Sequence, residues 1–432
     1  MDVTGLALRA AAARPCVLLA TLPGGTAARL QAERLSRLRD WPLAATPAQA
    51  DLLLVVGPDS PHLHAAVNRL WQALPAPRAR VHAPDADFIE AALEAGQTQL
   101  GSPAVQREHV EASAETFRND DDGAPDHQES SGGAHHEDED EGAAHGHAGA
   151  HGEHADGNGG HGGRQMEMPG GLPMAEQGED RDGLMLDRLH VPLGPFLNDW
   201  PVGLTIHLVL QGDVIQQADL EVPRPPTAGA PAPFWVQPWM RAAAGEPVSV
   251  GEGARRRAAA RLDGLARLLS VAGWPAEAVA ARRLRDDLLA GAPASEVVPR
   301  LDRFARRVGR SRTLAWLTRG IGHVSTREAR EAGVSGPAAH AGGDVTDRYR
   351  RWLADIRRDV GRMDELPLLQ PAVEESPRGY WKADDPPSAA LIRLLPKLLT
   401  GAEMAAARLI VAGLDPDPDE LAASGREVTA HG

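Results

Sequence analysis

The hydrophobic positions near the start of the chain form short continuous runs separated by helically spaced sets. The runs at 16–22 and 51–56 are apolar enough to be buried on both faces, as parallel strands are. Residues 26–38 lie between them and carry Ala and Leu at helical spacing. Further helices fit residues 61–74 and 86–93. Because a strand, a helix and a strand form a βαβ unit, the pattern predicts a small doubly wound α/β domain over residues 1–110.

Residues 166–425 begin with strict alternation and continue with helical periodicity. Ile206, Leu208 and Leu210 share one face of an expected strand, and Gln211-Gly212-Asp213 turns the chain into a second strand. A helical stretch at 254–289 is interrupted at Gly273-Trp274-Pro275 and carries leucines on one face and arginines on the other. Further helices fit residues 299–308, 344–363 and 386–412. We expect an α+β, mainly helical-bundle domain with an N-terminal β-hairpin.

Residues 111–165 show neither periodicity and are rich in Gly, His and acidic residues. Fourteen acids against the single Arg118 between 111 and 161 contribute −13 of the formal net charge of −15. A stretch with so few apolar residues cannot offset the entropy lost on ordering. We therefore expect a disordered His-rich linker between the two domains, whose remaining charge is close to neutral.

Composition narrows the range of functions. Near-neutral domains beside an acidic tract argue against nucleic acid as a partner. The sequence has no uncharged apolar run long enough for a spanning helix, so we expect a cytoplasmic protein. Cys16 is the single cysteine, which excludes a disulfide framework and an iron–sulfur cluster held by four of the chain's own thiolates.

The first domain resembles the B-subunit family of respiratory complex I. The matching segments are Thr46-Pro47-Ala48-Gln49-Ala50-Asp51, Val55-Val56-Gly57 and Leu74-Pro75-Ala76-Pro77. The resemblance implies a four-iron cluster on a tandem Cys pair and two later cysteines. Leu22-Pro23-Gly24-Gly25 stands where the pair would be, and Ala83-Pro84-Asp85 stands near the third ligand. No iron–sulfur cluster is expected, and Cys16 is interpreted as a small apolar residue of a buried strand.

The second domain resembles the D subunit of complex I, a relative of the nickel-iron hydrogenase large subunit. The similar segments follow the family order: 194–215, Leu317-Thr318-Arg319-Gly320-Ile321-Gly322, Gly333-Val334-Ser335-Gly336-Pro337, Gly343-Asp344-Val345-Thr346-Asp347-Arg348-Tyr349, Val373-Glu374-Glu375-Ser376-Pro377-Arg378-Gly379 and 394–416. The family's quinone pocket uses a hairpin histidine and a tyrosine. Residues 194–203 contain no histidine, neither Tyr349 nor Tyr380 stands at the tyrosine's place, and the hydrogenase cysteines are missing.

Arginines in the two best-matched turns are the candidate cofactor-binding residues. The resemblance places Arg319 and Arg378 at the junction of the two subunits, near the active site. A guanidinium can also bind a carboxylate bidentately, which is the basis of the alternative role. The alternative is a structural clamp between the domains. His190 and His207 lack a ligand partner at metal spacing and are interpreted as structural. Four tryptophans are expected to pack in the core: Trp235, Trp239, Trp274 and Trp316.

Histidines of the acidic tract are the candidate metal ligands. Imidazole suits nickel and other divalent metals, and an unstructured chain can wrap several such ligands around one ion. The alternative is a solvated linker whose composition carries no metal role. The candidate ligands are His135, His136, His145, His147, His151, His154 and His161.

Three functions follow from these observations. The first is a degenerate fusion of B-like and D-like subunits, which serves as an accessory or assembly subunit of a complex I-like or hydrogenase-like membrane complex without a redox centre of its own. It would associate peripherally with the cytoplasmic face of the membrane through its partners. The second is a nickel-handling chaperone that uses the His-rich tract. The third is an NADH-quinone oxidoreductase subunit, which would bind NAD or quinone with cofactors that partner chains supply.

Overall fold

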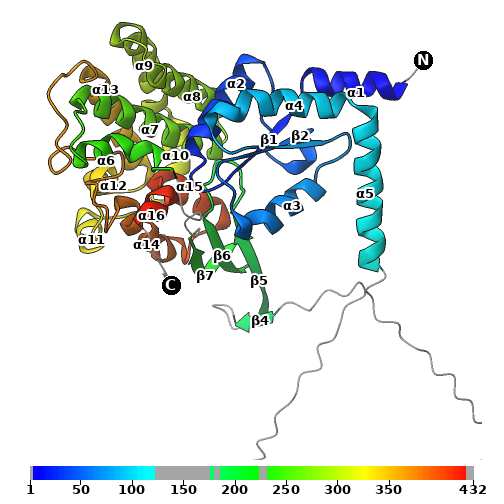
Figure 1. The fold of residues 1–432 in the computed structure, drawn as a ribbon. Helices are drawn as coiled ribbons and strands as arrows, with labels where there is room; N and C mark the ends of the chain where they lie inside the picture. Colours follow the sequence, from blue (N-terminus) through cyan, green and yellow to red (C-terminus); the bar gives the residue numbers. More distant parts are fainter. Residues whose placement is uncertain (1–2, 122–175, 180–184, 223–230, 425–432) are drawn as a thin grey trace, which may run out of the picture.

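The computed structural model describes residues 3–121, 176–179, 185–222 and 231–424. Two modules lie side by side, an α/β module from the first part of the chain and a mainly helical module from the second (Figure 1). The expected α/β fold followed by a helical module with a hairpin is confirmed. The candidate metal ligands from His135 to His161 lie outside the described residues.

A three-stranded parallel sheet forms the centre of the first module. Its order is β1-β2-β3, with β1 at Val17–Thr21, β2 at Leu52–Val56 and β3 at Ala79–Ala83. Leu43 adds a parallel bridge to Val17 on the free side of β1. The chain therefore moves to one side of β1 and then returns to form β2 on the other side. This change of direction places the topological switch point of the sheet at the carboxyl end of β1.

Helices cover both faces of this sheet, as the doubly wound prediction requires. α2 (Thr26–Leu38) and α4 (Ile89–Gly101) pack on the face that carries Leu52 and Leu54. α3 (His64–Gln72) packs on the opposite face. The bounds of α2 agree with the stretch predicted from its Ala and Leu spacing.

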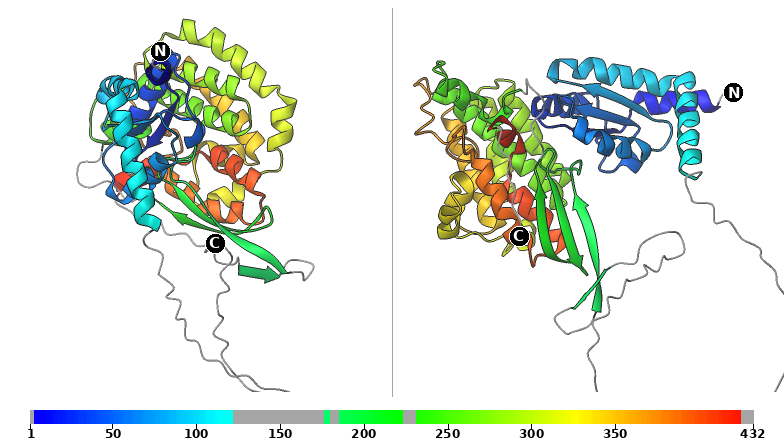
Figure 2. Two further views of the ribbon diagram at one scale, coloured as in Figure 1. Left: turned by 90° about the vertical axis from the view of Figure 1, so that its right-hand side faces the viewer. Right: turned by 60° about the horizontal axis from the view of Figure 1, so that its bottom comes forward.

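Three elements of this module were missed by the sequence patterns. β3 has only five residues and alternates Arg80 and His82 with buried neighbours, so its apolar signal is weak. α1 (Val3–Ala13) and α5 (Pro103–Asp121) lie on the side away from the second module (Figure 2). α5 continues past residue 110, where the first domain was expected to end. The division at 1–110, 111–165 and 166–425 stays a prediction.

The second module opens with a four-stranded antiparallel sheet. The order is β4-β5-β6-β7, at Glu176–Glu179, Met185–Leu193, Thr205–Gln211 and Val214–Glu221. The predicted hairpin is β6 and β7, and the two strands before it extend the sheet. Ile206 and Leu208 face a hydrophobic cluster that includes residues of α14 (Pro387–Leu399) and α15 (Met404–Leu414), as their alternation predicted.

A buried central helix, α7 (Val250–Val271), organises the helical part. α8 (Pro275–Leu289) follows the predicted break at Gly273-Trp274-Pro275, and α13 (Val345–Gly361) packs on α7. The remaining helices are α6 (Gln237–Ala243), α9 (Ala294–Gly309), α10 (Arg312–Thr318), α11 (Thr326–Glu331), α12 (Gly336–Ala341) and α16 (Pro418–Ser424). The long helix expected at 386–412 is wrong, because Gly401 has a φ of +82° and ends α14. The break lets the Gly401 amide donate to the Ile215 carbonyl of the sheet at 2.8 Å.

The simple separation of leucines and arginines on α7 is wrong. Arg257 and Arg261 are each only 4% exposed, although they belong to the arginine set. Both pair with Asp359 of α13, and Arg257 Nη2 lies 2.8 Å from Asp359 Oδ1. Small Ala residues at 258–260 are fully buried beside them. The pattern could not show this, because a buried guanidinium is tolerated only where a distant carboxylate meets it.

Tryptophans divide between core and surface. Trp235 and Trp239 are buried, at 2% and 0% exposure, and Trp274 is partly buried against the main helical core. The prediction is wrong for Trp316, which is 79% exposed on α10. An exposed indole of this kind is not part of any described core cluster.

Residues of the segment 343–349 hold backbone segments together. Asp344 caps α13 in a capping box with Asp347, and Asp344 Oδ2 accepts from the Gly320 amide at 2.6 Å. The Arg348 side chain is 1% exposed and donates to the Gly413, Gly322 and Gly343 carbonyls. These residues therefore connect three segments of the helical module.

Close backbone packing at the end of β1 gives a test of this architecture. A Cβ at Gly25 would lie 2.5 Å from the Val56 carbonyl oxygen, so backbone must move in a Gly25→Ala variant. We expect unfolding free energy to fall by roughly 2 kcal/mol or more. Gly361→Ala is the matched control, because nothing lies within 4 Å of a Cβ there. Chemical denaturation checks both variants, and equal stabilities for the two would contradict the packing described.

Candidate functional site

Buried charges connect the two modules across α2, α7 and α8. Arg29 Nη2 of α2 lies 2.8 Å from Asp263 Oδ2 of α7. Arg285 Nη1 of α8 lies 2.5 Å from Asp263 Oδ1 and 2.9 Å from Glu33 Oε2 of α2. Arg285 is 0% exposed, Asp263 is 1% and Glu33 is 5%. Each module supplies both a base and an acid, and the pairs Arg29–Asp263 and Arg285–Glu33 cross from one module to the other.

Opposite charges outweigh desolvation in this network. Burial alone would raise the pKa of Asp263, but Arg29, Arg267 and Arg285 together hold that pKa well below its ordinary value. Burial likewise opposes ionisation of Glu33, yet Arg285, Arg29 and Arg282 lower its pKa to about 2. Both carboxylates are therefore charged at neutral pH, and they act as fixed partners of arginine.

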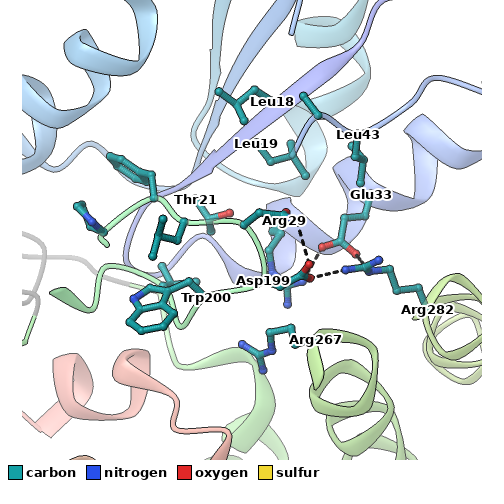
Figure 3. Close-up of a pocket in the computed structure, with 16 residues that line it drawn as sticks. Leu18, Leu19, Thr21, Arg29, Glu33, Leu43, Asp199, Trp200, Arg267 and Arg282 are labelled. Carbon is teal, nitrogen blue, oxygen red and sulfur yellow. Dashed lines mark hydrogen bonds and ion pairs between the residues drawn. The ribbon is translucent and has the colours of Figure 1, made fainter. Parts of the chain in front are cut away.

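A small cavity lies beside the network, between β1 and the loop that joins β5 to β6 (Figure 3). Asp199 Oδ1 accepts from Arg282 Nη2 at 2.5 Å, and the Trp200 indole donates to the Leu204 carbonyl at 2.7 Å. The cavity is about 80 Å³ in volume. Its charged and aromatic lining comprises Arg29, Glu33, Asp199, Trp200, Arg267 and Arg282. Because small-molecule pockets typically measure about 300–1,000 Å³, this space holds a few waters and no quinone ring.

The segment 194–203, where the resemblance implies a quinone-site histidine, lines this cavity. The structure thus brings the expected hairpin segment and the first module together. Asp199 and Trp200 occupy the space, and the Asp199 carboxylate is neutralised by Arg282. The residues present therefore do not fit a quinone.

The switch point of the α/β sheet is filled by the C-terminal segment. The Gly24 amide donates to Asp419 Oδ1 at 2.8 Å, and Thr26 Oγ1 donates to Asp419 Oδ2 at 2.9 Å. Leu22-Pro23-Gly24-Gly25 is the loop where the resemblance implies the cysteine pair. A carboxylate from α16 bonds this loop, and Cys16 lies before β1 with its backbone amide bonded to Asp51. The loop has no sulfur or imidazole ligand, so the residues do not fit an iron–sulfur cluster.

Arg378 and Arg319 lie in different environments. Arg378 is 4% exposed and pairs with Asp415 at 2.9 Å and with Asp417 at 3.5 Å. Arg319 is exposed on the surface of the second module and lines a separate pocket. The structure therefore does not bring the two arginines together. Arg378 pairs with Asp415 and Asp417, which belong to the segment that carries Asp419.

Carboxylates around Arg378 differ from those around Arg29. Burial, together with the neighbouring Asp417, raises the pKa of Asp419 to about 7. Burial also raises the pKa of Glu420 to about 7, although Arg378 opposes it. Asp417 and Glu420 share Arg378, and Asp415 also pairs with Arg267, whereas Asp263 alone faces three arginines. Burial with few arginine partners therefore favours the protonated form of Asp419 and Glu420.

The described part of the chain contains no cluster of three or more His, Cys, Asp or Glu that could hold a metal ion. His207 pairs with Glu221 on the exposed face of the hairpin, at 3.0 Å. Among these same residues, no helix is long and apolar enough to cross a membrane. The ion pairs at the junction hold α2, α7 and α8 together.

Sequence reasoning missed Glu33, Asp263 and Arg285 as the residues that connect the modules. Their separation along the chain hides the pairing, since Arg29 and Asp263 are 234 positions apart. One signal was present, because Asp263 lies within an otherwise apolar turn of α7. A buried acid in such a turn requires a base from elsewhere.

Removal of the Asp263 charge tests the network. Asp263→Asn leaves Arg29, Arg267 and Arg285 short of a buried partner, so we expect unfolding free energy to fall by about 3 kcal/mol. Asp287→Asn on α8 is the control, because the Asp287–Arg300 pair is 35% and 43% exposed. That control should change stability by less than about 1 kcal/mol. Urea unfolding compares the variants, and equal losses would contradict the assigned role of Asp263.

Asp419 gives a prediction on pH. Its folded pKa of about 7 lies above the ordinary value near 4, so the folded state holds the proton more tightly than the unfolded state. The resulting stability is present below pH about 4 and is lost as pH rises through about 7. In Asp419→Asn the side-chain oxygen can still accept from the Gly24 amide, and the side-chain NH2 can donate to Thr26 Oγ1. The substitution removes the negative charge. We expect thermal unfolding to show the variant as more stable at pH 8, with the difference shrinking as pH falls toward 4; a less stable variant at pH 8 would show that the ionised carboxylate is favourable.

Comparisons with other proteins add a distant likeness. No model of a known protein family matches the sequence, and no curated protein matches it. A chain in the structure of the membrane-bound sulfane sulfur reductase, an archaeal respiratory membrane complex, is structurally similar. The two share 15% sequence identity with a TM-score of 0.37, and the similarity covers 54% of this chain and 98% of the other.

Proposed function

We propose that this chain is an accessory or assembly subunit of a complex I-like or hydrogenase-like membrane complex, without a redox centre of its own. The observation that carries the proposal is the closure of the switch point by Asp419. In doubly wound domains, ligands bind outside the carboxyl ends of the strands at this point. Here the loop donors are bonded to the chain's own carboxylate instead.

The buried network supports a scaffolding role. Two modules that resemble separate subunits are connected in one chain through Arg29, Asp263 and Arg285, which are mutually satisfied. A catalytic junction would leave charged groups free to face a substrate. This junction instead uses its charges to hold the modules in one orientation, which suits a subunit that presents a fixed surface to partners.

The cavity weighs against a quinone-reducing subunit. Its volume of about 80 Å³ is far below the roughly 300–1,000 Å³ that is usual for small-molecule pockets. Cofactors from partner chains would therefore need a route other than this junction. Nickel handling by the residues from His135 to His161 stays a prediction, because those residues lie outside the described ranges.

Partner identification tests the proposal. Tagged protein is purified from gently solubilised membranes of its own host, beside an unrelated tagged soluble protein, and co-purifying subunits are quantified by mass spectrometry. We expect subunits of a membrane oxidoreductase complex to be recovered stoichiometrically with this chain and not with the control protein. The motifs that resemble two interacting subunits are the reason for this expectation.

Two results would contradict it. Recovery of the chain alone, with stoichiometric bound nickel, would favour metal delivery. A stoichiometric iron–sulfur spectrum from the purified chain would show that a cluster is held in spite of the missing ligands.

A further inference from the structure

An open pocket lies on the second module where α9, α10 and α13 meet. Its volume is about 550 Å³, within the range of about 300–1,000 Å³ that is usual for small-molecule sites. Its lining residues are Arg310, Ser311, Arg312, Ala315, Trp316, Arg319 and Arg350. None of these lines the junction cavity, so the pocket is a separate feature from the site described above.

The pocket carries an uncompensated positive charge. Its four arginines are all exposed, and none forms an ion pair with any residue that the structure describes. Three other arginines of α9 and α13 do form ion pairs. Arg307 pairs with Glu277 at 3.1 Å, Arg351 with Asp355 at 3.0 Å and Arg357 with Asp302 at 3.1 Å. Four unpaired guanidiniums around one concave space attract an anion with several charges.

Trp316 adds a flat apolar surface to this pocket. Its side chain is 79% exposed, while Trp235 and Trp239 are almost fully buried. An exposed indole stacks readily on a planar aromatic group. Ala315 beside it is buried, so the helix has its core face elsewhere and Trp316 is directed outward. The indole therefore contributes nothing to the described core and is available for a ligand.

We propose that this pocket binds a nucleoside diphosphate or triphosphate. The guanidiniums hold the phosphate oxygens, since the planar fork of arginine matches phosphate bidentately. The base stacks on Trp316. An inorganic anion would leave the indole unused, and a membrane surface is flat whereas this site is concave. The pocket volume matches a nucleotide, and the proposal does not depend on the proposed function.

Isothermal titration of the full chain tests the site with matched probes. ADP carries both the phosphates and the base, pyrophosphate carries the phosphates alone, and adenosine carries the base alone. We expect ADP to bind more tightly than pyrophosphate by about tenfold, which is the scale of one base–aromatic stack, and adenosine to give no measurable heat. Binding of ADP should weaken as salt increases, because the charges are exposed.

Three variants assign the binding to this pocket. Arg312→Gln combined with Arg319→Gln should weaken ADP and pyrophosphate binding by roughly tenfold or more, because charge-assisted bonds to phosphate are lost. Trp316→Leu should weaken ADP binding to the level of pyrophosphate and leave pyrophosphate unchanged. Arg327→Gln is the matched control, because Arg327 is an 82% exposed arginine outside the pocket. Circular dichroism melting confirms that each variant is folded, as expected for exposed positions.

Three results would overturn the proposal. Absence of heat with ADP at millimolar concentration would show that the pocket does not bind nucleotides. Equal affinity for pyrophosphate and ADP would show a plain anion site in which the indole has no part. An equal loss of affinity in Arg327→Gln and in the double variant would show non-specific attraction to the protein's arginines.

Discussion

The structure depends on the burial of Asp263 among three arginines. An ionised carboxylate at 1% exposure is tolerated only while its partners are in place, since a buried charge without a partner costs several kcal/mol. Arg29 comes from the first module and Arg285 from the second. Glu33 repeats the arrangement one turn further along α2. The relative position of α2, α7 and α8 is therefore set by electrostatics as much as by packing.

The closure of the switch point follows from the same orientation. Once α2 is held on α7, the loop at Gly24 and Thr26 faces the C-terminal segment, and Asp419 bonds both residues. Arg378 positions that segment by its contact with Asp415. Burial and the neighbouring Asp417 raise the pKa of Asp419. The three arginines around Asp263 instead lower the pKa of that carboxyl. One junction thus contains two opposite electrostatic environments. In both, the polar groups that a cofactor site would need are already bonded within the chain.

Charge satisfaction distinguishes the two notable sites of the protein. At the junction Arg29, Arg282 and Arg285 each meet a carboxylate, which suits a rigid connection between the two modules. On the outer face of the helical module, the four pocket arginines form no ion pair with a described carboxylate, and Trp316 is exposed to solvent. These arginines are Arg310, Arg312, Arg319 and Arg350. Some surface arginines elsewhere on α9 and α13 are paired, for example Arg357 with Asp302. Recognition of an outside molecule is therefore expected on the outer face rather than at the junction.

Local periodicity determined the elements whose signal lies within one segment. Continuous apolar runs identified β1 and β2, the helical spacing of 26–38 identified α2, and alternation about Gly212 identified β6 and β7. Each depends on one face being buried, which is written into neighbouring residues. The partners of Arg257, Arg285 and Arg378 were decided only by the tertiary structure, as was the break at Gly401. A charge's burial depends on residues that are up to 395 positions away, as Gly24 and Asp419 are, and no periodicity extends over that distance.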